Sequence, residues 1–366
     1  MATIQALIQA LREYEASGRQ FRAFVGFDGY EDKIQKVVEA KQGSEPIFFE
    51  SIANFSKHLG GLAGRSGQIE LLTQDTKLGG NAPIMANALG GLGFKNHCVG
   101  TLGFPEVAPV FRNMHPNCTT ISIANPAETN ALEFDDGKLI FSEVSTFEKL
   151  TWQYVREKAN FVNLRHYIIE SDVVAFVDWA NLSHCNDIWE GILKDIIIPS
   201  GTGNQHFFFD LADPSKRPVE EIKRAFDLIS TYQSHGKVTL GMNENEAHKI
   251  ASALGFETDK VTLTDIGELI LANLRVEQLL IHPTERSIVY HHQQIYEEKG
   301  RYITKPKILT GGGDNLNAGF CLGLVLGLDI ALCMILGMAT SGAYIQNGYS
   351  PEIQDLINYL EVWENE

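Results

Sequence analysis

The chain alternates between short apolar runs and longer stretches with helical periodicity. Buried β-strands are predicted by apolar runs at 21–27, 172–178, 206–211, 237–241 and 278–282, and a further strand is predicted at 95–101. Helices are predicted between them, at 4–14, 82–92, 151–160, 217–232, 244–254 and 263–274. Because strands and helices alternate, the pattern indicates an α/β fold with a mostly parallel central sheet flanked by helices.

A different pattern at 119–143 interrupts this alternation. Two runs of alternating polar and apolar residues surround Asp135-Asp136-Gly137, which is typical of a β-hairpin. The segments 33–41 and 69–73 also have the pattern of exposed strands. We therefore expect one domain over 1–366, with a small antiparallel β lid whose strands are inserted within about 33–78 and 119–143. An edge extension of the main sheet is the alternative.

One apolar segment is long enough to cross a membrane. Residues 318–339 are apolar except for Asp329. The segment contains four glycines, and Gly327-Leu328-Asp329 is typical of a turn. We therefore expect two packed core helices here and no membrane partner.

Charge and cysteine content limit the possible partners. The net charge is −16 and no block of Lys or Arg is present, which argues against nucleic acid and anionic membranes as partners. The five cysteines are odd in number and form no CxxC pair, which favours a reducing, cytoplasmic environment. In such an acidic chain, an anionic substrate needs local positive potential from helix N-termini or from bound magnesium.

The segment Thr310–Gly319, TGGGDNLNAG, has the strongest chemical signal. Gly311, Gly312 and Gly313 allow backbone N–H groups to converge on an anion, and a helix is predicted to begin near Asp314. A carboxylate beside such a site can accept a proton from an attacking hydroxyl, as phosphoryl transfer requires. An Asp that merely caps a helix after a flexible loop is the alternative. The segment has neither the Lys-Ser/Thr pair of a Walker loop nor the spacing of a dinucleotide fingerprint.

Two earlier segments are candidates for binding hydroxyl groups. In VGFDGYED (25–32) acidic residues follow a buried strand, at the end where open α/β sheets bind ligands. Asp28, Glu31 and Asp32 are therefore candidate polyol ligands, and a solvated acidic turn is the alternative. In LGGNAPIMANALGGLG (78–93), Gly80 allows close approach of a ligand and Asn81 offers both a donor and an acceptor. A tight turn into a closely packed helix is the alternative.

A fourth segment, GMNENEA (241–247), follows the predicted strand 237–241. Asn243 and Glu246 lie at the start of a predicted helix. Glu246 there compensates the helix dipole or reaches magnesium through water.

Together, in this order, the four segments resemble the ribokinase-like (phosphofructokinase-B family) carbohydrate kinases over nearly the whole chain. The resemblance implies that Asp314 is the catalytic base and that Gly311, Gly312 and Gly313 form the anion hole. It also implies that Asp32, for which Asp28 competes, binds sugar or nucleoside hydroxyls together with Gly80 and Asn81. ATP and Mg²⁺ are the implied cofactors, and a homodimer through the lid is a possible assembly.

The resemblance extends to the nucleotide side of the site. It implies that Asn243 lies by the nucleotide phosphates, that Glu246 acts on magnesium through water, and that Thr284 and Asn347 flank the nucleotide base.

The sequence departs from the family pattern at several places, two of which bear on whether the protein is active. Ile308 stands where the family usually has Asp before its GAGD motif, and HPTERS (282–287) replaces a T-x-G-x-x-G loop. These departures favour an alternative, a catalytically impaired kinase-fold protein that binds sugar or nucleotide, whereas the presence of Asp314 favours an ATP-dependent kinase acting on a sugar, sugar derivative or nucleoside. A nucleotide-dependent dehydrogenase is disfavoured because no GxGxxG follows the first strand.

Overall fold

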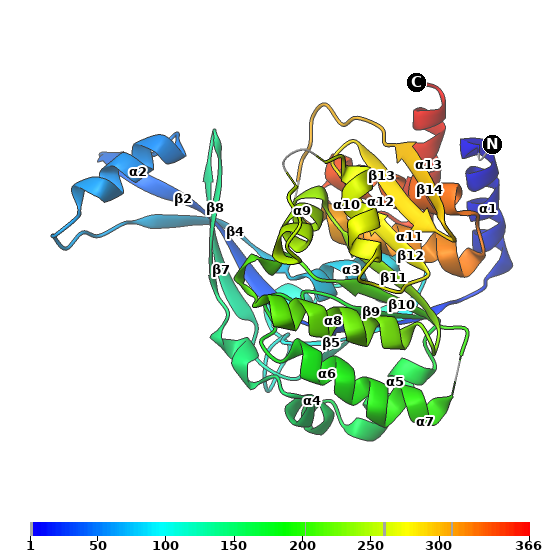
Figure 1. Ribbon diagram of the computed structural model, residues 1–366. Helices are drawn as coiled ribbons and strands as arrows, with labels where there is room; N and C mark the ends of the chain where they lie inside the picture. The colour runs from blue at the N-terminus through cyan, green and yellow to red at the C-terminus, as the bar shows by residue number, and fades with distance from the viewer. Residues whose placement is uncertain (1–2, 202, 259–260, 309) are drawn as a thin grey trace.

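The computed structural model describes residues 3–201, 203–258, 261–308 and 310–366, which contain two β-sheets (Figure 1). The larger sheet has nine strands in the order β14-β13-β12-β11-β10-β9-β1-β5-β6. All neighbours from β12 to β6 are parallel, and β13 and β14 add an antiparallel edge. Its strands are β1 (Arg22–Phe27), β5 (Lys95–Gly100), β6 (Cys118–Ser122), β9 (Val173–Phe176), β10 (His206–Asp210), β11 (Lys237–Met242), β12 (Gln278–Ile281), β13 (Arg286–His291) and β14 (Gln294–Lys299).

Helices cover both faces of this sheet, and each face buries its own apolar core. On one face, α4 (Trp152–Lys158), α5 (Phe161–Ile169), α6 (Cys185–Ile192), α7 (Ile198–Ser200), α8 (Val219–Tyr232), α9 (Glu244–Ala253) and α10 (Leu263–Leu271) follow one another. The opposite face carries α1 (Ile4–Ser17), α3 (Asn81–Gly91), α11 (Gly312–Leu326), α12 (Ile330–Asn347) and α13 (Ile353–Glu364). The central strands β9 to β12 are buried along almost their whole length because they pack against helices on both sides.

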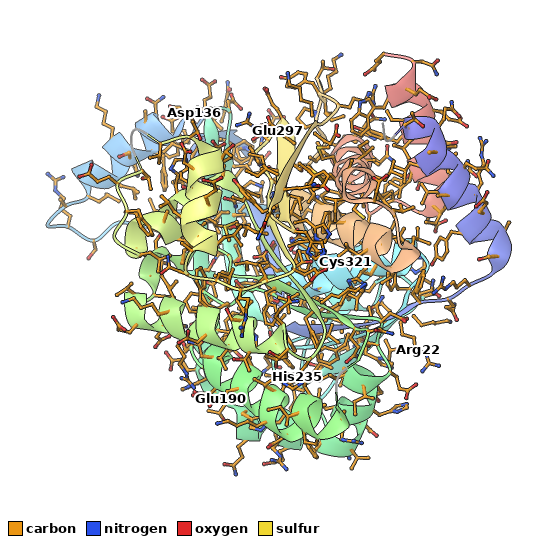
Figure 2. All side chains as sticks on the ribbon, turned by 45° about the vertical axis from the view of Figure 1, so that its right-hand side comes forward. Arg22, Asp136, Glu190, His235, Glu297 and Cys321 are labelled. Atoms are coloured by element: carbon orange, nitrogen blue, oxygen red, sulfur yellow. The ribbon has the colours of Figure 1, made fainter. Side chains whose placement is uncertain are left out.

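Short helical turns complete the main body. They are η1 (Pro109–Phe111), η2 (Ser145–Lys149), the π-helical turn η3 (Leu193–Ile197) and η4 (Pro214–Lys216). Figure 2 shows the density of side chains in this body, with Cys321 of α11 inside it. All five cysteines are free thiols, and four of them are buried.

The smaller sheet projects from the main body (Figure 1). It consists of β2 (Tyr30–Gln42), β3 (Glu45–Phe48), β4 (Leu71–Gly79), β7 (Ala127–Phe134) and β8 (Gly137–Glu143), with α2 (Ile52–Gly61) beside it. We call this unit the lid. Its own small core contains Val37, Phe49, Phe55 and Leu132. The predicted turn at Asp135-Asp136 joins β7 to β8, and Phe134 pairs with Gly137.

The structure corrects two details of the predicted lid. Cys118–Ser122 is not a lid strand, because it pairs in parallel with β5 and forms the edge of the main sheet. The lid is also not wholly antiparallel, since β2 pairs in parallel with β7 while its other partners, β3 and β4, run antiparallel to it.

Helices α11 and α12 form the predicted core pair, with Gly327 in the left-handed conformation at the turn between them. They pack closely because a Cβ on Gly323 would lie 2.8 Å from the Sγ of Cys333. By length and composition α12 could cross a membrane, but 72% of its most apolar window is buried inside the protein. Core packing therefore accounts for its apolar sequence.

Candidate active site

Carboxylates gather at the carboxyl ends of neighbouring strands in the main sheet. Asp28 follows β1, Asp178 follows β9, and Asp210 ends β10. Glu246 lies in the first turn of α9, directly after β11. Because these strands are adjacent and parallel, their carboxyl ends bring the four side chains to one edge of the sheet.

The glycine run places a helix N-terminus at the same edge. Gly311 caps α11 with φ 90°, a left-handed conformation that favours glycine. A Cβ on Gly311 would also lie only 2.8 Å from the Tyr344 hydroxyl, which donates a hydrogen bond to the Thr310 carbonyl (2.9 Å). The first hydrogen bond of the helix joins Asn315 N–H to the Gly311 carbonyl. The N–H groups of Gly312, Gly313 and Asp314 therefore have no acceptor within the helix and are available to an anion.

Asp314 lies in this first turn and is almost completely buried. Its Oδ1 has no hydrogen-bond partner among the described residues. Burial is the main cause that raises its pKa well above the ordinary value, and the further contributions come from Asp210, Asp28, Asp178 and Glu246. Since all four of these groups are carboxylates, the surroundings of Asp314 are acidic and favour cations and hydroxyl donors.

The pKa values of the neighbouring acids are raised as well. Burial, opposed by hydrogen bonds from backbone N–H groups, raises the pKa of Asp28 to about 7. Burial also raises the pKa of Asp210 to about 6, although Ala212 N–H and Asn317 Nδ2 donate to its carboxylate. For Glu246, burial and then the charge of Asp210 raise the pKa to about 8. Several buried carboxylates at one edge of the sheet favour a bound cation there.

Asp178 and Asp210 are site residues that the sequence reasoning missed. Asp178 is buried in a left-handed conformation (φ 56°) and accepts hydrogen bonds from the Tyr30 hydroxyl (3.0 Å) and from Asn181 Nδ2 (2.6 Å). Both acids end apolar runs, DVVAFVD and HFFFDL, so their position at the carboxyl ends of buried strands was the available signal.

The predicted hydroxyl-binding residues lie between the lid and α3. Ala82 N–H donates to Asp28 Oδ1 (2.9 Å), while Asp28 Oδ2 has no partner within the described part of the chain. A Cβ on Gly80 would lie 2.5 Å from Asp28 Oδ2, so the two residues are in direct contact. Asp32 is on β2, where its carboxylate lies against Gly79, and burial is the main cause that raises its pKa. Asp28, Asp32, Gly80 and Asn81, the first residue of α3, are thus brought together.

Segments close to two of the predicted nucleotide residues, Thr284 and Asn347, contact the glycine run. His282, directly after β12, lies against Gly313: its Cε1 would be 3.3 Å from a Cβ there. Thr284 is exposed two residues later. A Cβ on Gly312 would lie 3.3 Å from Ile345 near the end of α12, where Asn347 is the last residue.

Asn243 and Glu246 have a structural role in addition to any binding role. Asn243 Oδ1 accepts from Glu246 N–H and Glu246 Oε2 accepts from Asn243 N–H, both at 2.9 Å. This capping box fixes the start of α9. The box occupies one oxygen of each side chain, so Glu246 Oε1 and Asn243 Nδ2 are the atoms left to point toward a ligand.

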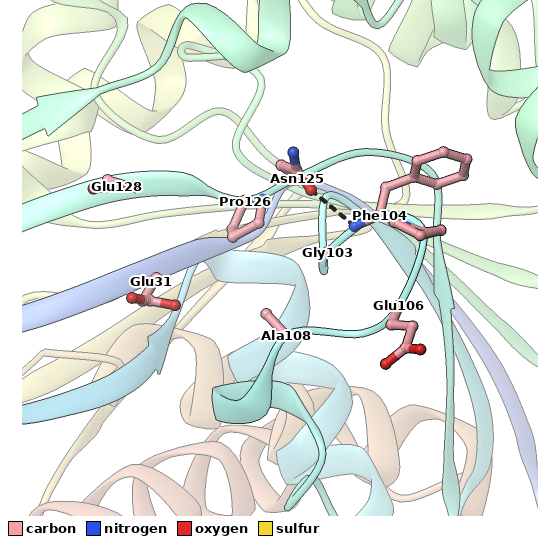
Figure 3. Close-up of a pocket in the computed structure, with 9 residues that line it drawn as sticks. Glu31, Gly103, Phe104, Glu106, Ala108, Asn125, Pro126 and Glu128 are labelled. Atoms are coloured by element: carbon pink, nitrogen blue, oxygen red, sulfur yellow. Dashed lines mark hydrogen bonds between the residues drawn. The ribbon is translucent and has the colours of Figure 1, made fainter.

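A hollow of about 530 Å³ lies at the base of the lid, lined by residues such as Glu31, Phe104 and Glu128 (Figure 3). Phe104 N–H donates to Asn125 Oδ1 (2.8 Å) at its rim. Because side chains alternate along a strand, Glu31 points to the face of β2 opposite Asp32. This hollow is therefore distinct from the acidic site.

The geometry can be compared with known proteins. A family model described as prokaryotic ketohexokinase matches residues 1–363. The chain belongs to this family. A ketohexokinase from Haloferax volcanii is 23% identical over 343 residues, which are 92% of this chain and 89% of the relative. The chain is therefore a ribokinase-like carbohydrate kinase, a phosphotransferase with an alcohol acceptor.

Solved structures share the fold of this ketohexokinase-family chain. Adenosine kinase from Sinorhizobium meliloti superposes with a TM-score of 0.66 at 15% identity, covering 94% of this chain and 99% of the neighbour. Ribokinase from Arabidopsis thaliana, solved with ribose and ATP, gives 0.65 at 14% identity, covering 93% and 98%. A ribokinase-like protein from E. coli, solved with ATP and Mg²⁺, gives 0.62 at 11% identity, covering 94% and 100%. The predicted α/β fold with a β lid is confirmed.

Proposed function

We propose that this protein transfers the γ-phosphoryl group of ATP to a hydroxyl of a ketohexose, with Asp314 as the base. The observation that carries the proposal is the position of Asp314, buried at the N-terminus of α11 beside unpaired backbone N–H groups and opposite Asp28. The choice of a ketohexose as substrate rests on the family and on the ketohexokinase relative. The site alone fits any polyol.

In the proposed reaction the sugar lies between Asp32, Asp28, Gly80 and Asn81. Asp314 accepts the proton of the attacking hydroxyl through Oδ1, whose lack of a partner suits this role. The hydroxyl oxygen forms a bond to the γ-phosphorus, and the bond from that phosphorus to ADP breaks. The N–H groups of Gly312 and Gly313 donate to the transferred phosphoryl group and stabilise its charge.

The acidic residues beside this site fit Mg²⁺. After burial, the charge of Asp210 is the largest cause that raises the pKa of Glu246, as expected for two oxygen ligands without a cation between them. Bound there directly or through water, Mg²⁺ would supply positive charge to the ATP phosphates. The segments of Thr284 and Asn347, which contact the glycine run through His282 and Ile345, would lie beside the nucleotide, and Asn243 at the start of α9 would lie by its phosphates.

The lid supports a further proposal, that two copies associate through it. Six of its large apolar side chains are exposed: Ile47, Leu59, Leu71, Leu72, Ile140 and Phe141. Apolar side chains gathered on one small unit are typical of a protein–protein interface. A lid–lid dimer would bury those that lie on its contact face and would hold the lid over the sugar.

A coupled ADP assay tests the proposed reaction. The protein is supplied with ATP and Mg²⁺ and with ketohexoses, aldohexoses and nucleosides in turn, and the largest kcat/KM is expected for a ketohexose. A larger value for nucleosides would refute the substrate assignment. Calorimetric binding of sugar without turnover of any substrate would instead support the impaired-kinase alternative.

A further inference from the structure

Two histidines and a glutamate meet at the edge of the main sheet that is remote from the acidic site. Glu277 immediately precedes β12, so it lies at the opposite end of this strand from His282. His291 is the last residue of the antiparallel strand β13 and pairs with Gln278. It therefore lies at the same end of β12 as Glu277. His292 begins the turn into β14, at the edge of the sheet that Figure 1 shows beside α12.

The donor atoms of these three side chains are close together. One nitrogen from each ring and one carboxylate oxygen of Glu277 all lie within 4.8 Å of one another. His292 Nε2 is 3.4 Å from Glu277 Oε1, and the two ring centroids are 4.0 Å apart. Ligands at about 2.0–2.1 Å from a tetrahedral ion lie about 3.4 Å apart, so the His292–Glu277 distance already suits a shared metal.

The backbone brings neighbouring side chains to the same side. In a regular strand the side chains of His291 and His292 would point to opposite faces. Here His292 and Gln293 have positive φ values of 46° and 63°, as in a type I′ turn, where Asn and Gly are the usual residues. The turn therefore uses unfavoured residue types in a conformation that places both imidazoles beside Glu277.

A backbone carbonyl also orients one of the rings. His291 Nδ1 lies 3.2 Å from the Glu277 carbonyl oxygen and 3.3 Å from Gln278 Nε2. A proton on Nδ1 would be donated to that carbonyl and would leave Nε2 with its lone pair. Metal-binding histidines commonly have their second nitrogen hydrogen-bonded in this way.

We propose that Glu277, His291 and His292 bind a divalent transition-metal ion, with water completing the coordination. Two imidazole nitrogens and one carboxylate select zinc-like ions over magnesium, which prefers oxygen ligands. Because the site joins the start of β12 to the β13–β14 turn, the ion would fasten the antiparallel edge of the sheet. Its role is stabilising and does not depend on the proposed kinase reaction.

Calorimetric titration with Zn²⁺ tests the site. The full-length protein is first treated with a chelator and then titrated in saturating Mg²⁺, which occupies oxygen-rich sites. The wild type should bind Zn²⁺ and its Tm should rise. The His292→Ala variant should bind at least about tenfold more weakly and lose the Zn²⁺-dependent rise in Tm. The His292 side chain is 70% exposed, so its removal leaves the fold intact.

Two further variants make the result specific. Glu277→Gln removes a carboxylate ligand and should weaken Zn²⁺ binding in the same way. His58→Ala removes an exposed histidine of the lid and should bind as the wild type does. Equal Zn²⁺ affinity of His292→Ala and the wild type, or no Zn²⁺ binding by the wild type in Mg²⁺, would overturn the proposal.

Discussion

Replacing Asp28 with Asn should stabilise the ligand-free protein, and by more at high pH. Asp28 is fully buried, and its pKa is raised from 3.8 to about 7 chiefly by burial. The folded state therefore holds the proton more tightly than the unfolded chain does. Protonated Asp28 gives the folded state its full stability below pH 3.8. That contribution to the free energy of unfolding is lost as the pH rises through about 7. Asn stays neutral, and its Oδ1 can still accept from Ala82 N–H.

The magnitude follows from the two pKa values. One tenfold change in proton affinity corresponds to about 1.36 kcal/mol. By single-site linkage, ionisation of buried Asp28 lowers the free energy of unfolding of the wild type by about 2 kcal/mol at pH 5 and by about 4 kcal/mol at pH 8. The gain in free energy of unfolding from Asp28→Asn should thus be larger at pH 8 than at pH 5, by about 2–3 kcal/mol.

Urea unfolding of both proteins at these two pH values, without nucleotide or divalent ions, measures this difference. Asp227→Asn, which removes an exposed carboxylate of α8, is the matched control and should show a much smaller change with pH. A stability gain from Asp28→Asn that is the same at both pH values would refute the reasoning that Asp28 is a buried, protonated acid in the ligand-free protein.

Four other outcomes are expected at the site and the lid. Asp314→Asn should lower kcat about 10²- to 10⁴-fold with little change in sugar affinity by calorimetry, and wild-type turnover would exclude it as the base. Gly311→Ala should lower the free energy of unfolding by about 1–3 kcal/mol because of its positive φ and Tyr344, and an unchanged urea midpoint would contradict this. Glu246→Gln should raise the Mg²⁺ concentration for half-maximal rate about tenfold, whereas an unaltered Mg²⁺ dependence would remove it from the metal site. Phe141→Glu should shift the sedimentation coefficient from dimer to monomer, and a monomeric wild type would end the lid-dimer proposal.

Local signals predicted the main body of the fold well. The strands β1 and β9 to β12 are rich in apolar residues because they are buried on both faces, and such runs are visible without knowledge of tertiary contacts. The turn between α11 and α12 was equally visible, since Gly327 and the Asp329 cap are local features.

Segments at sheet edges were harder to predict. Cys118–Ser122 is half-buried at the edge of the main sheet, and its alternating pattern is the same as that of a lid strand. The β13–β14 hairpin was missed because its turn contains His292 and Gln293, not the Asn and Gly that mark such turns.

The candidate site could be predicted only where residues lie in recognisable local motifs. Asp314 and Asn81 are in glycine-rich segments that stand out in the sequence, and the structure places both at the acidic edge. Asp178 and Asp210 are single acids at strand ends, and their convergence depends on the order of strands in the sheet. Pairing order is set by contacts between distant segments, which single-sequence patterns do not contain.

The lid is connected to the main body through the residues that would hold the sugar. Only Asp28 and Gly29 separate β1 from β2, and only Gly80 separates β4 from α3. A tilt of the lid therefore moves Asp32 relative to Asp28. A sugar bound between these two residues and a lid–lid contact that holds the lid over the sugar would both favour the same lid position. Thermodynamic reciprocity then requires that dimerisation tighten sugar binding by the same factor by which sugar tightens the dimer. A kinase built in this way would have a sugar KM that falls as its own concentration rises.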